Sequence, residues 1–326
     1  MKDSAKKLIS NIARWGVAGL ILFWLFRSGK LSDLRDLDKL FQQPLFFFLA
    51  CAGLITNYVL NFVRWQVLLT GIGIGIPFSQ IVRLSMIGQF FSIIMPGSVG
   101  GDLIKAVYIA KSFPTEKTSA VASILLDRIL GFLTLMAFAS FFFVLSFDAT
   151  HLPPSLQGFG ALLALGTCAL FLFVLLPGRA VKFLSRLETS NSIVQRVLKT
   201  LKAFARSPAT ILKGLLISFL SQGGAIFGMY FIGRAVYGAL PWGDLDLMRF
   251  ISATAVGTTA SALPLSPMGL GIGQVAFAKV FTLLGAPEEA YGIVIISAVQ
   301  IIAFMLNLSG AIWFLKSKKE VQQAMS

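Results

Sequence analysis

The hydrophobic positions of this chain fall into long apolar runs that are separated by short polar segments. A run must have about 20 residues to cross the hydrocarbon of a bilayer as a helix, and backbone polar groups cannot stay unpaired there. Apolar runs therefore predict membrane-spanning α-helices, although the first run is short. The predicted spans are roughly Ile12–Phe26, Pro44–Val63, Ala120–Phe147, Leu156–Leu176, Ile211–Val236 and Gly292–Leu315.

Two further apolar segments, about Ile81–Ala110 and Phe250–Leu284, are interrupted near their middle by proline and glycine. Each arm beside a break has about 10 to 15 apolar residues, too few for an ordinary crossing but enough for half of a re-entrant helical hairpin. The sequence thus predicts an all-α, polytopic membrane protein with about six transmembrane helices and two re-entrant hairpins, against an alternative of eight spans. The residues predicted to form the breaks are Pro96, Gly97, Gly100, Gly101, Pro264, Pro267, Gly269 and Gly271.

The order of span, hairpin and span occurs twice, at about 44–147 and 211–315, within a single membrane domain of residues 1–326. Landmarks recur at similar offsets: Pro77 and Pro241 are 164 residues apart, and Arg64 and Arg234 are 170 apart. The two halves start from opposite sides, which predicts an inverted repeat. The alternative is that proline and arginine mark the ends of membrane helices without any duplication. Paired broken helices in two halves are typical of a transporter's substrate site.

Basic residues concentrate between Arg179 and Lys213 and at both termini, whereas acidic residues gather in the segments assigned to the other face. Short loops rich in lysine and arginine stay in the cytoplasm, so both termini are predicted to be cytoplasmic in a multi-pass protein of the cell inner membrane. In the connector at about 179–208, apolar residues recur at helical spacing with basic residues between them. This predicts an amphipathic helix on the cytoplasmic leaflet, or a plain basic connector.

The composition agrees with a membrane protein: 56% of residues are hydrophobic and 13% are charged, against roughly 25% charged residues in soluble domains. The net charge is +14, and the basic residues stand mainly between the apolar runs. This arrangement favours membrane lipids with anionic headgroups as partners and excludes nucleic acid. The sequence indicates no particular protein partner. His151 is the only histidine, and the glycine-rich runs follow no strand. We therefore expect no metal, no cofactor and no enzyme activity.

Ionisable residues at membrane depth are costly and are candidates for function. The candidate substrate-binding residues are Arg128, Asp127, Asp102, Arg64, Arg83 and Gln274; Lys105 follows Asp102 in the sequence. In the functional interpretation, Arg128 with Arg64 or Arg83 binds a phosphate. In the alternative, the charged residues pair with one another and only hold helices together, while Arg64 and Arg83 extend to the membrane surface. For Gln274 the alternative to a headgroup contact is an amide contact between helices.

At these residues the chain resembles a known family. The resemblance rests on Arg64-Trp65, on Phe90-Phe91 followed by Met95-Pro96-Gly97 and Gly100-Gly101-Asp102, on Asp127-Arg128-x-x-Gly131, and on Leu263-Pro264 through Gly269-x-Gly271. The chain is similar to the flippase-like membrane family that includes the transmembrane half of lysylphosphatidylglycerol synthases and small bacterial inner-membrane proteins. The resemblance implies a polytopic helical fold that moves a lipid between leaflets.

The resemblance also sets limits on the function. In bifunctional members of the family a soluble aminoacyl-transferase domain follows the membrane part, whereas this chain ends about ten residues after its last predicted span, so synthase activity is not expected. Asp127 and Gln274 stand where relatives often have glutamate, and the second departure predicts a different substrate or coupling. The predicted function is a lipid translocase for an anionic phospholipid or lipid-linked precursor. The alternatives are an intramembrane enzyme acting on a lipid phosphate, or a non-transporting scaffold of a lipid-modifying complex.

Overall fold

The computed structural model describes residues 37–94, 99–146, 154–175, 207–238, 247–261 and 269–316. Throughout these ranges the regular elements are α-helices, which confirms the predicted all-α, polytopic class. The predicted span Ile12–Phe26 and the predicted connector up to residue 206 lie outside the described residues. The helices are α2 (Leu37–Gln42), α3 (Pro44–Gly71), α4 (Phe78–Ile94), α5 (Val99–Ser112), α6 (Lys117–Ser146), α7 (Pro154–Leu175), α10 (Pro208–Tyr237), α11 (Leu247–Ser261), α12 (Ile272–Leu283), α13 (Ala290–Leu308) and α14 (Gly310–Lys316).

Within the ranges that the structure describes, four helical stretches are long and apolar enough to cross a membrane: α3, α6, α10, and α13 with its continuation α14. They coincide with four of the predicted spans, and α7 coincides with a fifth. One predicted boundary is wrong, because α3 continues beyond Val63 to Gly71. The sequence predicts that the span ends before Arg64, whereas Arg64 is a buried, paired residue inside the helix.

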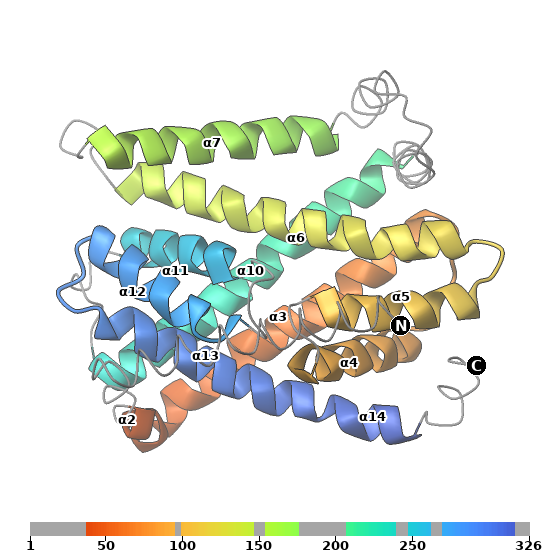
Figure 1. Ribbon diagram of the computed structural model, residues 1–326, viewed down its shortest axis with the longest axis horizontal. Coiled ribbons are helices and arrows are strands. Elements are labelled where there is room, and N and C mark those ends of the chain that lie inside the picture. Colours follow the sequence, from red (N-terminus) through yellow and green to blue (C-terminus); the bar gives the residue numbers. More distant parts are fainter. Residues whose placement is uncertain are drawn as a thin grey trace, which may run out of the picture.

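Each interrupted segment forms two short helices that pack against each other, α4 with α5 and α11 with α12. The two pairs lie at opposite ends of the long axis, and the helix ends that flank each break point toward the middle of the molecule (Figure 1). In the first pair the backbones are close, because a Cβ atom at Gly101 would overlap the carbonyl group of Gly88. The structure therefore contains two helical hairpins; their re-entrance into a membrane stays a prediction.

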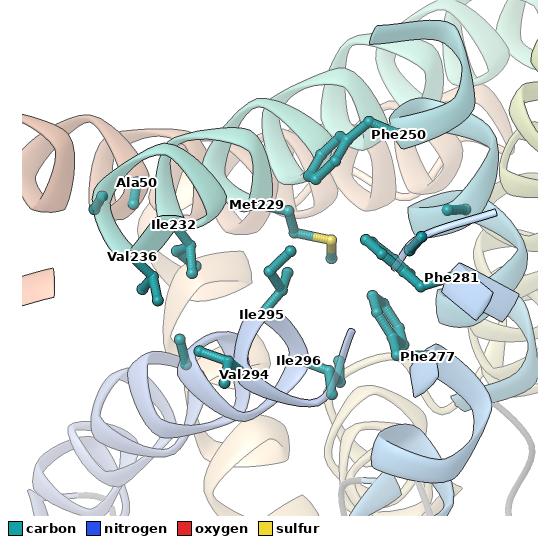
Figure 2. Packing of buried hydrophobic residues seen from close by; sticks show 14 of the residues in the cluster. Ala50, Met229, Ile232, Val236, Phe250, Phe277, Phe281, Val294, Ile295 and Ile296 are labelled. Atoms are coloured by element: carbon teal, nitrogen blue, oxygen red, sulfur yellow. The ribbon is translucent and has the colours of Figure 1, made fainter. Parts of the chain in front are cut away.

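The two hairpins have separate hydrophobic cores. Phe250 of α11, Phe277 and Phe281 of α12, Ile295 of α13 and Met229 of α10 belong to one cluster (Figure 2). A second cluster surrounds Trp65 of α3 and includes residues of α4, α5 and α6. Each hairpin is thus fixed to the long helix that precedes it in the chain.

The long helices α3 and α10 cross each other at a contact made of glycine residues. A Cβ atom at Gly53 would lie 2.6 Å from the carbonyl oxygen of Gly224 and 2.7 Å from the backbone nitrogen of Gly228. Small residues four apart allow membrane helices to approach this closely. Gly224 and Gly228, four residues apart on α10, thus make room for the α3 backbone at this crossing. Beyond this crossing, α6 packs on α11, whereas α13 and α14 pack on α4, so that each half contacts the hairpin of the other.

Candidate functional site

A cavity of about 670 Å³ lies among the helices of the bundle. Its size falls in the range of small-ligand sites, which is roughly 300 to 1,000 Å³. The wall combines apolar side chains with charged and amide side chains at the centre of an otherwise apolar protein. The polar side chains in the wall are Asn57, Tyr58, Asn61 and Arg64 of α3, Ser85 and Gln89 of α4, Lys105 of α5, Asp127 and Arg128 of α6, Gln222 of α10 and Thr258 of α11.

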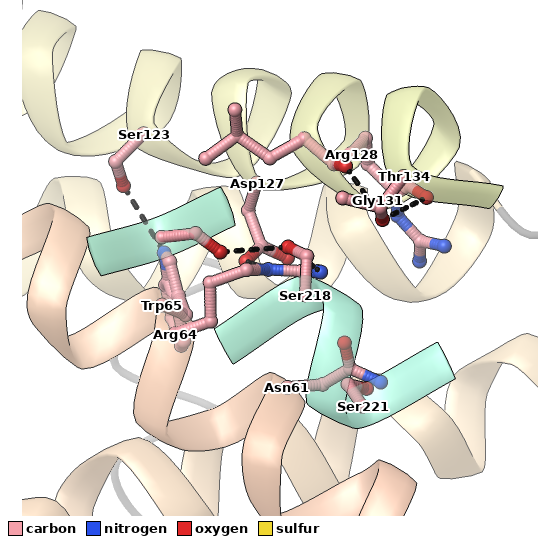
Figure 3. Close-up of polar contacts among 12 residues, drawn as sticks. Asn61, Arg64, Trp65, Ser123, Asp127, Arg128, Gly131, Thr134, Ser218 and Ser221 are labelled. Atoms are coloured by element: carbon pink, nitrogen blue, oxygen red, sulfur yellow. Dashed lines mark hydrogen bonds and ion pairs between the residues drawn. The ribbon is translucent and has the colours of Figure 1, made fainter. Parts of the chain in front are cut away.

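The deepest charges form one ion pair, between Arg64 Nε and Asp127 Oδ1 at 2.7 Å (Figure 3). Their side chains are only 5% and 10% exposed. Arg64 Nη1 also donates to Ser218 Oγ at 2.9 Å, which connects α3 and α6 to α10. A Cβ atom at Gly131 would come within 3.2 Å of Arg64 Nη1, so glycine leaves room for the guanidinium group. Buried charges are tolerated when they are paired and hydrogen-bonded, as these are.

The second ion pair joins α6 to the first hairpin. Arg128 binds the Asp102 carboxylate with two nitrogens, Nε to Oδ2 at 2.6 Å and Nη2 to Oδ1 at 3.0 Å. Asp102 stands in the first turn of α5, where a negative charge is favourable beside the helix dipole. The Arg128 side chain is 50% exposed although it also lines the cavity, so the cavity wall and the outer surface meet at this residue.

Lys105 is a third cation in the cavity wall. Its Nζ lies 4.1 Å from the centroid of the Trp65 ring, within the range of a cation–π interaction. Trp65 Nε1 in turn donates to Ser123 Oγ at 3.0 Å, which fixes the orientation of the ring (Figure 3). The sequence placed Lys105 only beside Asp102 and did not assign it to the candidate site. Its spacing of three residues from Asp102, nearly one helical turn, was the available signal.

Amide groups form the part of the wall that sequence reasoning missed. Asn57 and Asn61 stand one turn apart on α3, and Asn61 Nδ2 donates to Asn57 Oδ1 at 3.2 Å. Tyr58, between them, donates its hydroxyl to Asn307 Oδ1 of α13 at 2.8 Å. These residues carry no charge, so their position in an apolar run did not single them out.

Arg83 and Gln274 are not brought into this cavity. Gln274 Oε1 accepts a hydrogen bond from the backbone nitrogen of Gly271 at 2.8 Å, and its Nε2 donates to Gln300 Oε1 at 2.6 Å. A further bond at 3.2 Å reaches Ser297 Oγ. Gln274 therefore makes the amide contact between helices that was the alternative interpretation.

The predicted breaks are described only in part. Gly100 and Gly101 fall in the first turn of α5, where Gly101 permits the close approach to α4. Gly269 and Gly271 have φ angles of +72° and +78°, which favour glycine. Pro96, Gly97, Pro264 and Pro267 lie outside the described residues. Within the ranges that the structure describes, no three His, Cys, Asp or Glu side chains gather as a metal site would require.

Comparisons with known proteins agree with the membrane assignment. A family described as the lysylphosphatidylglycerol synthase TM region matches residues 11–310, which include every helix that lines the cavity. A UPF0104 membrane protein of Pyrococcus horikoshii is 24% identical over 337 residues, covering 92% of this chain and 94% of that protein. No solved structure matches the chain.

Proposed function

The chain belongs to the family of the lysylphosphatidylglycerol synthase transmembrane region, and from this premise we propose that it is a lipid translocase. It moves an anionic phospholipid or a lipid-linked precursor between the leaflets of the inner membrane by alternating access. The observation that carries the proposal is the cavity with charged and amide walls inside a bundle of apolar helices. A polar headgroup needs such a solvated path, because it cannot cross hydrocarbon unaided.

The outer surface suits the lipid tails. Large apolar side chains face outward on the long helices, among them Phe48 of α3, Phe141 of α6, Leu220 of α10 and Met305 of α13. Arg128 is half exposed and also lines the cavity. A headgroup that enters beside Arg128 keeps its tails against the apolar surface. The position of Arg128 thus supports lateral access from the bilayer.

The contacts that each half makes with the hairpin of the other half support alternating access. The helix that follows the first hairpin, α6, packs on the second hairpin, and the helices that follow the second hairpin, α13 and α14, pack on the first. Inverted repeats change access by moving one repeat against the other around a central site. The proposed halves are the predicted ones, at about 44–147 and 211–315.

The proposal is tested with the full-length chain reconstituted into vesicles that contain headgroup-labelled phosphatidylglycerol. We expect the wild type to move the label between leaflets and Arg128→Ala to lose most of this movement. Arg83→Ala is the matched control, because Arg83 does not line the cavity. A wild type no faster than protein-free vesicles would contradict the proposal.

The same vesicles separate the two alternatives. A new lipid product, found by mass spectrometry, would favour the intramembrane enzyme acting on a lipid phosphate. Full cellular function of Arg128→Ala together with a co-purified protein would favour the scaffold.

A further inference from the structure

The charges in the cavity wall are not equivalent. Arg64 is neutralised by Asp127, and Arg128 by Asp102, each through a hydrogen-bonded ion pair. Among the lining residues that the structure describes, Lys105 is the cation with no carboxylate oxygen within 4.0 Å of its charged group. The paired residues add little net charge to the cavity, so its positive charge comes from Lys105.

The Lys105 side chain is held in a fixed direction. A Cβ atom at Gly88 would lie 2.8 Å from Lys105 Cγ and 3.0 Å from Cδ, so the aliphatic stem crosses the α4 backbone where there is no side chain. The charged end rests on the Trp65 ring. An aromatic face attracts the ammonium group but does not satisfy all three of its N–H donors. Lys105 thus keeps N–H donors for a ligand in the cavity.

A second observation on α4 points to the same ligand. Ser85 is only 2% exposed, and its hydroxyl has no hydrogen-bond partner in the structure, although it lines the cavity. A buried hydroxyl without a partner costs free energy, and native proteins rarely leave one. Gln89, one helical turn later, lines the same wall with its amide group. A donor hydroxyl and an amide thus stand on the helix that Lys105 crosses.

We infer that Lys105, Ser85 and Gln89 form a subsite for the anionic phosphate oxygens of a lipid headgroup. The inference rests on the proposed function. It assigns the phosphate to the first hairpin, whereas the sequence pointed to Arg128. The ammonium group supplies the charge, and the serine and glutamine side chains supply neutral donors. Soluble phosphate compounds share this chemistry, but the surrounding apolar helices favour a ligand that carries acyl chains.

The test measures lipid binding to the purified full-length chain by native mass spectrometry, with dioleoyl phosphatidylglycerol as the probe. Lys105→Met keeps the stem that packs on Gly88 and removes the charge. We expect it to bind the probe at least about tenfold more weakly than the wild type. Ser85→Ala should give a smaller loss, and Lys105→Arg should retain binding. Lys111→Met is the matched control, because Lys111 lies on the same helix and is exposed.

Two ligand controls identify the source of the phosphate. Dioleoylglycerol has the tails without the phosphate and should bind weakly to wild type and to Lys105→Met alike. Glycerol 3-phosphate has the phosphate without the tails and should not displace the lipid at equal concentration. Effective displacement by glycerol 3-phosphate would overturn the lipid assignment. Binding of phosphatidylglycerol by Lys105→Met within about twofold of wild type would overturn the subsite.

Failure of this inference differs from failure of the translocase proposal. If Lys105→Met loses binding while the wild type moves no lipid in vesicles, the subsite stands and the translocase is wrong. If Lys105→Met binds and moves lipid like the wild type, the translocase stands and the subsite is wrong. Retention of binding by Lys105→Arg separates loss of charge from loss of fold.

Discussion

Asn57 of α3 and Ser221 of α10 bind each other reciprocally. Asn57 Nδ2 donates to both the carbonyl oxygen and the hydroxyl of Ser221 at 2.9 Å, and Ser221 Oγ donates to the carbonyl oxygen of Asn57 at 3.2 Å. The two residues are 164 positions apart and belong to the two predicted halves. The contact therefore joins the halves at the α3–α10 crossing. The inverted repeat itself stays a prediction.

Gly53→Ala should destabilise the protein through this crossing. The new Cβ atom would lie 2.6 Å from the Gly224 carbonyl oxygen, and backbone on both sides leaves nothing flexible to move. Overpacking of this kind costs about 1 to 3 kcal/mol. The measurement is thermal unfolding of the purified protein in detergent. Gly223→Ala is the control, since its Cβ atom would meet nothing within 4 Å; equal melting temperatures for the two variants would contradict the prediction.

Asp127→Ala should lower stability strongly, because it leaves the Arg64 guanidinium group buried and without its counter-charge. Removing one partner of a buried ion pair typically costs about 3 to 5 kcal/mol. The double variant Arg64→Met with Asp127→Ala should recover part of this loss, because no buried charge remains. Denaturation of all three proteins under one condition measures the difference. A double variant less stable than Asp127→Ala would refute this account of the pair.

The sequence predicted the long helices well, because a helix that crosses lipid must be apolar over most of its length. It predicted the position of Arg64 wrongly for the same reason. A charge in an apolar run marks the end of the run unless a partner neutralises it, and the partner Asp127 is 63 residues away. The sequence predicts pairing among Asp102, Asp127 and the arginines only as the alternative interpretation, and the structure shows Arg128 paired with Asp102. Tertiary packing decides which carboxylate each arginine meets, and spacing along the sequence does not show this.

Most of the site residues that the sequence did not predict are polar but uncharged. Asn57 and Ser85 stand in apolar runs at little apparent cost, so composition and spacing gave no reason to select them. Only the structure shows that Asn57 holds the central crossing and that the hydroxyl of Ser85 lacks a partner. For Gln274 the sequence allowed a headgroup contact or an amide contact, and the structure shows the amide contact.

Asp102→Asn should behave differently from the substitution at Asp127. Arg128 lines the polar cavity, which the translocase proposal requires to be solvated, so water in the cavity solvates the guanidinium group when its counter-charge is removed. Exposed ion pairs contribute about 0 to 1 kcal/mol, and the melting temperature should change little. The released positive charge at the cavity wall should instead strengthen binding of phosphatidylglycerol. Native mass spectrometry measures the binding; a variant as unstable as Asp127→Ala would show that the Asp102 pair is structural.

Gln274→Leu should reduce stability without changing lipid preference. The substitution removes the hydrogen bonds that Gln274 makes to the buried Gly271 backbone N–H and to the Gln300 side-chain carbonyl, and a buried group left unsatisfied costs about 1 to 3 kcal/mol. Because Gln274 and Gln300 share a hydrogen bond, Gln274→Leu with Gln300→Leu should cost less than the sum of the single changes. Unfolding measures the coupling. The ratio of bound phosphatidylglycerol to bound phosphatidylcholine should equal that of the wild type, because Gln274 does not line the cavity. A changed ratio would contradict this assignment and show that Gln274 contributes to headgroup recognition.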